Sequence, residues 1–175
     1  LYQLYEEQGI RWRAGAWPRQ QVQEFFQQLQ AQHRRASTIA SAIEINQPVN
    51  LPKALRALEW CDGVVREVTD QEILDAKAQV GVHGLGCEPA SAASVAGLKR
   101  LRQEGVISKD ERVVCVLTGH QLKDPTATVA YHSTDPQMFE EVLGKRGVRR
   151  PTFANRSVQV PNDLGEIIKA IELYA

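Results

Sequence analysis

The sequence predicts an α/β protein with three layers, αβα, built on a mainly parallel sheet. Residues 113–117, Val-Val-Cys-Val-Leu, carry no charge and do not alternate polar with apolar side chains. Such a strand is normally covered on both faces, as in parallel sheets flanked by helices. The preceding segment, residues 90–101, is rich in Ala and Ser and places Val95, Leu98 and Leu101 on one face, which is typical of a helix packed closely on a sheet.

The N-terminal 36 residues are predicted to be a divergent helical segment. Leu1, Tyr2, Leu4 and Tyr5 resemble the last turns of a helix that ends at Gly9. Val22, Phe25, Phe26 and Leu29 then follow the i, i+3, i+4, i+7 spacing of one helical face. This second helix is either an ordinary surface helix or a helix that binds a partner.

Residues 37–175 are expected to form a C-terminal α/β lobe in which helices and strands alternate. A short helical piece is predicted at residues 38–43, followed by a helix that Asn50 caps and that ends at Trp60. A capping box, Thr69-Asp70-Gln71-Glu72, begins a helix that ends at Gly81. Further helices are predicted at residues 136–143 and 164–174. The expected strands are residues 64–68, 83–87, 112–117 and 157–160.

Composition narrows the class of protein. The chain has 175 residues, 43% of them hydrophobic, with 21 basic and 21 acidic residues. Zero net charge gives no electrostatic reason to expect nucleic acid or an anionic membrane surface as a partner. No apolar run approaches the ~20 residues of a bilayer span. No targeting leader, a basic stretch followed by an apolar one before a cleavage site, is recognised. A soluble, cytoplasmic protein is therefore expected.

The cysteines and histidines predict no metal site. Cys61, Cys87 and Cys115 are too few and too scattered for a disulfide framework or for paired metal ligands. We expect free thiols, with Cys115 buried in its strand. The spacing of the four histidines is not that of metal ligands.

Ligands of parallel α/β sheets bind at the carboxyl ends of strands and the amino ends of helices. Residues 118–120, Thr-Gly-His, and 88–91, Glu-Pro-Ala-Ser, occupy those two positions. Each residue also has a structural interpretation: Thr118 as the end of a strand, Ser91 as a helix cap and Glu88 as a charge favoured by the helix dipole. His120 is either a proton shuttle or a hydrogen-bonding loop residue.

These two linked motifs, residues 88–97 and 114–125, resemble threonine synthase, a pyridoxal-phosphate enzyme of fold type II. The similarity covers roughly residues 37–175 and looks like the C-terminal portion of cyanobacterial-type members. It implies one lobe of an enzyme that converts O-phosphohomoserine and water to threonine and phosphate. It also implies that Thr118 lies against the pyridine nitrogen of the cofactor, with Ser91, Glu88 and Gly119 nearby.

The chain departs from the family pattern in one important respect. The cofactor-binding lysine of the family lies in a Ser-x-Lys-Asp motif and the cofactor phosphate in a Gly-Asn-x-Gly-Asn loop, and neither motif occurs in this sequence. Lys123 is expected to be a loop or salt-bridge lysine. We therefore assign no catalytic residue and expect pyridoxal phosphate to be shared with an N-terminal lobe, without which the chain is inactive.

Two other functions stay open. One is a non-catalytic relic or split domain that binds a protein partner or a small effector, for which the rewritten residues 10–36 are the motivation. The other is a related serine or threonine dehydratase, which the motifs favour less. A homodimer is the usual assembly of the family.

Overall fold

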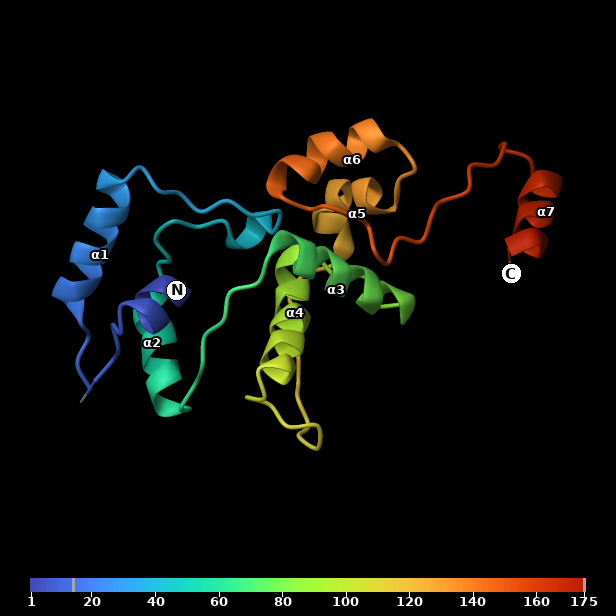
Figure 1. The fold of residues 1–175 in the computed structure, drawn as a ribbon. Coiled ribbons are helices and arrows are strands. Elements are labelled where there is room, and N and C mark those ends of the chain that lie inside the picture. The colour runs from blue at the N-terminus through green and yellow to red at the C-terminus, as the bar shows by residue number, and fades with distance from the viewer. Residues whose placement is uncertain (14, 175) are drawn as a thin grey trace.

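The computed structural model describes residues 1–13 and 15–174. The chain is arranged as helices joined by extended segments (Figure 1). The α-helices are α1 Arg19–Ala31, α2 Leu51–Trp60, α3 Asp70–Val82, α4 Pro89–Gln103, α5 Pro125–His132, α6 Pro136–Val142 and α7 Leu164–Tyr174. The shorter turns are a π-helix, η1 Gln3–Glu7, and the 3₁₀ turns η2 Ser41–Ile43, η3 Gln121–Lys123 and η4 Gly144–Arg146.

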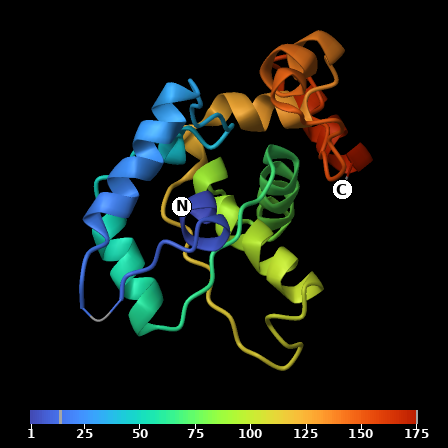
Figure 2. The ribbon, with the colours of Figure 1, turned by 60° about the vertical axis from the view of Figure 1, so that its left-hand side comes forward.

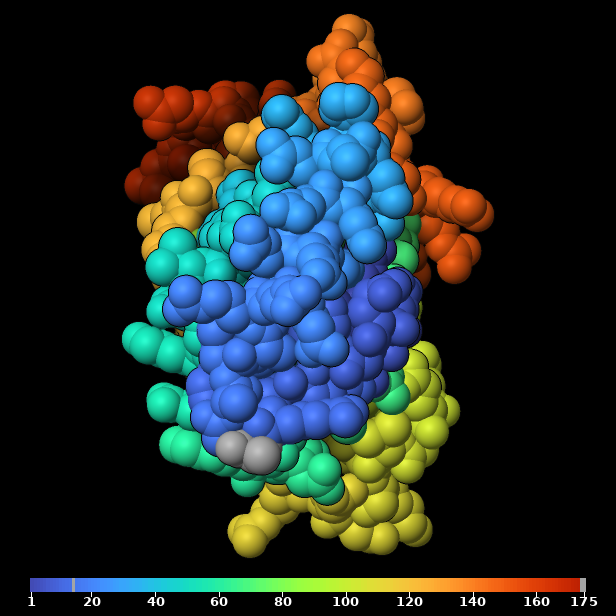
Figure 3. Space-filling view, turned by 90° about the vertical axis from the view of Figure 1, so that its left-hand side faces the viewer, coloured from blue at the N-terminus to red at the C-terminus, as the bar shows by residue number. Residues whose placement is uncertain are grey.

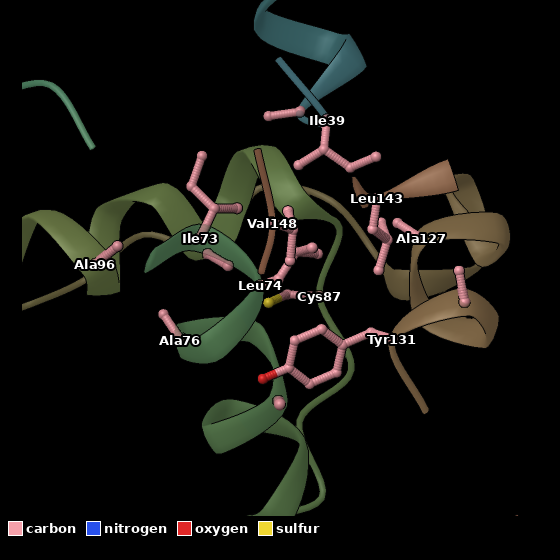
Figure 4. Close-up of a cluster of buried hydrophobic side chains, with 14 residues drawn as sticks. Ile39, Ile73, Leu74, Ala76, Cys87, Ala96, Ala127, Tyr131, Leu143 and Val148 are labelled. Atoms are coloured by element: carbon pink, nitrogen blue, oxygen red, sulfur yellow. The ribbon is translucent and has the colours of Figure 1, made fainter. Parts of the chain in front are cut away.

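Two separate hydrophobic clusters hold these helices. The first lies among η1, α1 and α2, where Leu4, Val22 and Leu55 are buried. The N-terminal helices that surround this cluster form one face of the molecule (Figure 3). The second and larger cluster joins α3, α4, α5 and the segment after α6, with Leu74, Tyr131 and others at its centre (Figure 4). Figure 2 shows the first group of helices beside the α3–α4 pair.

Helices α3 and α4 form the centre of the molecule, and local signals place both of them. Thr69 accepts a hydrogen bond from the Glu72 backbone N–H at 3.2 Å, and Glu72 accepts one from the Thr69 N–H at 2.7 Å. The predicted capping box is therefore confirmed. Pro89 occupies the first turn of α4, where its missing N–H costs no hydrogen bond. The Arg100 guanidinium then joins α4 to the Glu72 carboxylate at 2.8 Å.

The predicted cap of α2 is wrong in its detail. The helix begins beside Asn50, but the Asn50 side chain makes no capping hydrogen bond. The Asn50 carbonyl still accepts the first hydrogen bond of the helix, from the Ala54 N–H, as the residue before any α-helix does.

The mainly parallel sheet is not observed in the part of the chain that the structure describes. Residues 64–68, 83–87, 112–117 and 157–160 are connecting segments, and only isolated bridges occur, such as Cys87 with His120. A strand needs the backbone of a neighbouring strand to satisfy its donors and acceptors. Apart from the bridge at Cys87, none of these described segments is paired as a strand, and Val114 is 87% exposed and Cys115 is half-buried instead of buried.

Helix α7 lies away from both clusters at the end of an extended segment (Figure 1). Its bounds agree with the prediction, and the Asp163 side chain caps it by accepting from the Glu166 N–H at 3.0 Å. Its apolar residues Leu164, Ile168 and Ile171 are exposed. Among the described residues, no helix is both long and apolar enough to cross a bilayer.

Candidate functional site

The two sequence motifs meet at the start of α4. Cys87 and His120 form an antiparallel bridge. The Glu88 N–H donates to the Gly119 carbonyl at 3.0 Å, and the Gln121 N–H donates to the Gly86 carbonyl at 3.2 Å. Backbone hydrogen bonds thus fix the loop that carries Thr118 across the amino end of α4.

Ser91 links the two motifs through its side chain. It is 2% exposed and accepts a hydrogen bond from the Gly119 N–H at 2.9 Å. Its Oγ lies 3.2 Å from Thr118 Oγ1. A hydroxyl has one proton and two lone pairs, so Ser91 can accept from Gly119 and still donate to Thr118. In that arrangement the exposed Thr118 keeps its own proton for an acceptor outside the protein.

Glu88 and Gly119 pack directly against each other. The Glu88 residue is 6% exposed, and a Cβ atom placed on Gly119 would overlap its Oε1. Only glycine leaves room for this carboxylate. Lys123 Nζ lies 3.9 Å from the same oxygen and is itself 63% exposed, so Lys123 is placed as the partner of a buried carboxylate.

His120 is a structural residue of the loop. Its Nδ1 accepts a hydrogen bond from the Leu122 N–H at 3.2 Å and caps η3. Of the two interpretations left open by the sequence, the geometry favours the hydrogen-bonding loop residue over the proton shuttle.

The arrangement can hold a flat heterocycle by one edge. Thr118 presents a neutral hydroxyl donor that Ser91 orients, and Gly119 follows it in the chain. A neutral donor suits an unprotonated ring nitrogen, which is a hydrogen-bond acceptor. The donor set therefore fits the pyridine edge of pyridoxal phosphate.

Comparison with known proteins agrees with this chemistry. The sequence profile of the family described as "Pyridoxal-phosphate dependent enzyme" matches residues 11–119, which is more than half of the chain. The chain belongs to this family. The enzymes of this family depend on pyridoxal phosphate and have fold type II.

Within this family, the chain is similar to several threonine synthases. It is 51% identical to the enzyme of Methanocaldococcus jannaschii over 98 residues, covering 55% of this chain and 24% of that protein. The threonine synthase of Synechocystis sp. is 48% identical over 93 residues, covering 53% and 24%. Threonine synthase 2, chloroplastic, of Arabidopsis thaliana is 32% identical over 138 residues, covering 79% and 25%. The resemblance inferred from the two motifs is thus confirmed.

The family member spans about a quarter of the length of the curated relatives it matches. The stretch aligned with the Arabidopsis protein is 138 of 175 residues, so it contains residues 38–138 wherever it begins. Both motifs of the candidate site therefore lie within the region of similarity.

The structure also brings together residues that the sequence did not single out. Lys77 of α3, Thr128 of α5 and His132 line one hollow of about 250 Å³. The sequence signal was small, because Lys77 is only a lysine between two alanines on a helix. A second hollow, of about 300 Å³, lies between Thr38, Asp124 and Arg146. Neither hollow is lined by Thr118 or Ser91.

Proposed function

We propose that the chain is the C-terminal part of a threonine synthase, which converts O-phosphohomoserine and water to threonine and phosphate. In this proposal residues 37–175 are the C-terminal lobe and residues 1–36 are a divergent N-terminal helical segment, although the family profile already matches from residue 11. The observation that carries the proposal is the contact between Ser91 and Thr118, which joins the two motifs shared with these enzymes. Membership of the pyridoxal-phosphate family and the similarity to three threonine synthases support it.

Thr118, Ser91, Gly119 and Glu88 are the residues proposed to hold the cofactor ring. Bound pyridoxal phosphate supplies an electron sink for the substrate carbanion. Thr118 donates to the ring nitrogen, and Ser91 holds the Thr118 hydroxyl in place. Gly119 leaves room for the Glu88 carboxylate beside this loop, and Glu88 fixes the loop through its backbone N–H. Since a hydroxyl does not force protonation of the ring nitrogen, the sink is weaker than with an acidic partner, which favours elimination over transamination.

The remaining parts of the site are proposed to come from an N-terminal lobe. That lobe would supply the cofactor-binding lysine and the phosphate loop, and without it the chain would be inactive. The exposed apolar segment 112–117 supports this view, because Val114 and Val116 are 87% and 66% exposed. We expect these residues to become a strand of the parallel sheet when the lobes join. The cytoplasm is the proposed location, and a homodimer the proposed assembly.

A chimeric enzyme tests the proposal. In Arabidopsis threonine synthase 2 the aligned stretch is replaced by the corresponding residues of this chain, and phosphate release from O-phosphohomoserine is measured. We expect threonine and phosphate in equal amounts. Thr118→Val in the chimera should lower kcat at least about tenfold, because it removes the donor to the ring nitrogen.

The matched control is Thr134→Val, which removes an exposed hydroxyl that lies within residues 38–138 and outside both motifs. It should leave turnover unchanged. Visible absorbance of bound cofactor reports independently that the chimera has folded. A chimera that binds the cofactor and releases no phosphate, or a Thr118→Val chimera that is fully active, would contradict the proposal.

A further inference from the structure

The hollow that contains Lys77 lies outside the proposed cofactor site. It is enclosed by α3, the loop after α3, the C-terminal end of α5 and the segment that follows α6. Its volume is about 250 Å³, somewhat below the ~300–1,000 Å³ of pockets for drug-sized ligands, so it suits a ligand of only a few heavy atoms. Its walls combine a few polar side chains with an apolar side formed by Ala78, Val82, Leu85 and Phe153.

Lys77 is a buried cation at the wall of this hollow. The residue is 7% exposed, and its Nζ donates to Thr128 Oγ1 at 2.7 Å. Among the described residues it forms no ion pair with a carboxylate. Burial lowers the pKa of Lys77, against the smaller opposing effects of Cys87 and Asp124. Burial also raises the pKa of the Cys87 thiol, so Cys87 supplies no countercharge at neutral pH.

Two further donors line the same hollow. Thr128 accepts from Lys77, so its own hydroxyl proton is available to a ligand. His132 Nδ1 accepts from the Asn155 N–H at 2.9 Å, which places the proton of the neutral imidazole on Nε2. Burial and the nearby Lys77 lower the pKa of His132, so it is neutral at pH 7. An ammonium, a hydroxyl and an imidazole N–H thus line one cavity.

We propose that this cavity binds a small organic carboxylate. The carboxylate would accept from Lys77, Thr128 and His132, and its carbon chain would lie against Val82, Leu85 and Phe153. An unpaired buried ammonium is costly, and an anion offsets that cost. The side chains of Val82, Leu85 and Phe153 are 77%, 59% and 41% exposed, so a carbon chain that packs on them removes apolar surface from water, which inorganic phosphate cannot do. The site is independent of the proposed threonine synthase activity.

Butyrate is the probe for the test, with butyramide as its uncharged analogue of the same shape. Each is titrated into the ¹⁵N-labelled 175-residue chain, and amide shifts and calorimetric heats are recorded at pH 7. We expect saturable binding of butyrate, with the largest shifts at Lys77, Thr128 and His132. Butyramide and inorganic phosphate should each bind at least about tenfold more weakly.

Variants distinguish the effect of the buried Lys77 ammonium from the effect of positive charge elsewhere on the chain. Lys77→Met keeps most of the side-chain volume and should weaken butyrate at least about tenfold. Thr128→Val should weaken it several-fold and serves as a second test of the same site. Lys109→Met and Thr152→Val are the exposed controls and should bind as the wild type does.

The proposal fails if butyrate and butyramide bind equally or if phosphate binds as tightly as butyrate. It also fails if the Lys77→Met chain keeps its affinity, or if the shifts fall on surface lysines.

Discussion

Ser91 is the residue on which the candidate site depends most directly. It lies one turn into α4, yet its hydroxyl reaches the end of a segment 27 residues further along the chain. A buried hydroxyl with two partners fixes both of them, because each partner loses a hydrogen bond if Ser91 moves. The position of Thr118 is therefore set by a residue of the other motif.

Ser91→Ala should lower the free energy of unfolding by about 1–3 kcal/mol, because the Gly119 N–H is left buried without an acceptor. Urea denaturation followed by circular dichroism measures this change. Ser94→Ala is the control, since its exposed hydroxyl only donates to a carbonyl of its own helix. Equal unfolding midpoints for the two variants would show that Ser91 does not hold the loop.

Gly119→Ala should destabilise the chain, because the added Cβ enters the space of the Glu88 carboxylate. The expected loss is about 1–3 kcal/mol, the usual range for overpacking. Glu88→Ala in the same chain should recover part of the loss, since the clashing group is gone, and a double-mutant cycle from thermal unfolding measures the coupling. Strictly additive effects would argue against the contact.

At the scale of elements, α3 and α4 are joined through Glu72. This residue completes the capping box of α3 and also accepts from the Arg100 guanidinium of α4 at 2.8 Å. The Glu72 carboxylate thus caps the start of α3 and also holds α3 against α4. Burial opposes the ionisation of Glu72, but hydrogen bonds from Thr69 and Arg100 outweigh it and lower the pKa below its usual value.

The depressed pKa of Glu72 predicts how stability depends on pH. Its contribution should be fully present above about pH 4.5, the value in an unfolded chain, and should be lost as pH falls through the lower folded value. Chemical denaturation between pH 3 and 7 should therefore show a smaller acid-induced loss for Glu72→Gln than for the wild type. The exposed Glu7→Gln chain is the control and should follow the wild type. Identical pH profiles for Glu72→Gln and wild type would disprove the assignment.

At the scale of the whole molecule, two hydrophobic clusters coexist with uncovered apolar segments. The extended residues 112–117 and the apolar side of α7 are both largely exposed. Exposed apolar backbone of this kind readily pairs with other chains. The sequence of residues 112–117 favours a strand, but a strand forms only beside another strand. Without such a neighbour these residues stay extended and exposed.

The double change Val114→Lys and Val116→Lys should reduce self-association of the chain, because it places charge on an unpaired apolar segment. Static light scattering across a concentration series measures this, and the midpoint of thermal unfolding should stay the same. Val49→Lys is the control, since Val49 is 93% exposed but lies in a short turn. If Val49→Lys has the same effect, the segment 112–117 is not the site of association.

The sequence by itself determined the ends of several helices and the cofactor of the family, but it did not predict helix α5. The capping box at Thr69, the proline at the start of α4 and the bounds of α7 were predicted because helix ends depend on residues within one turn. The pairing of the two motifs likewise indicated pyridoxal-phosphate chemistry, and the family match agrees with it.

Only the tertiary structure decided which distant residues meet. It joined Ser91 to Thr118 and buried Lys77 beside Thr128. In the described part of the chain it formed isolated bridges instead of the predicted sheet. The physical reason is the range of the interactions: a helix satisfies its backbone within its own residues, whereas strands, buried charges and shared hydroxyls depend on groups that the chain brings together only on folding.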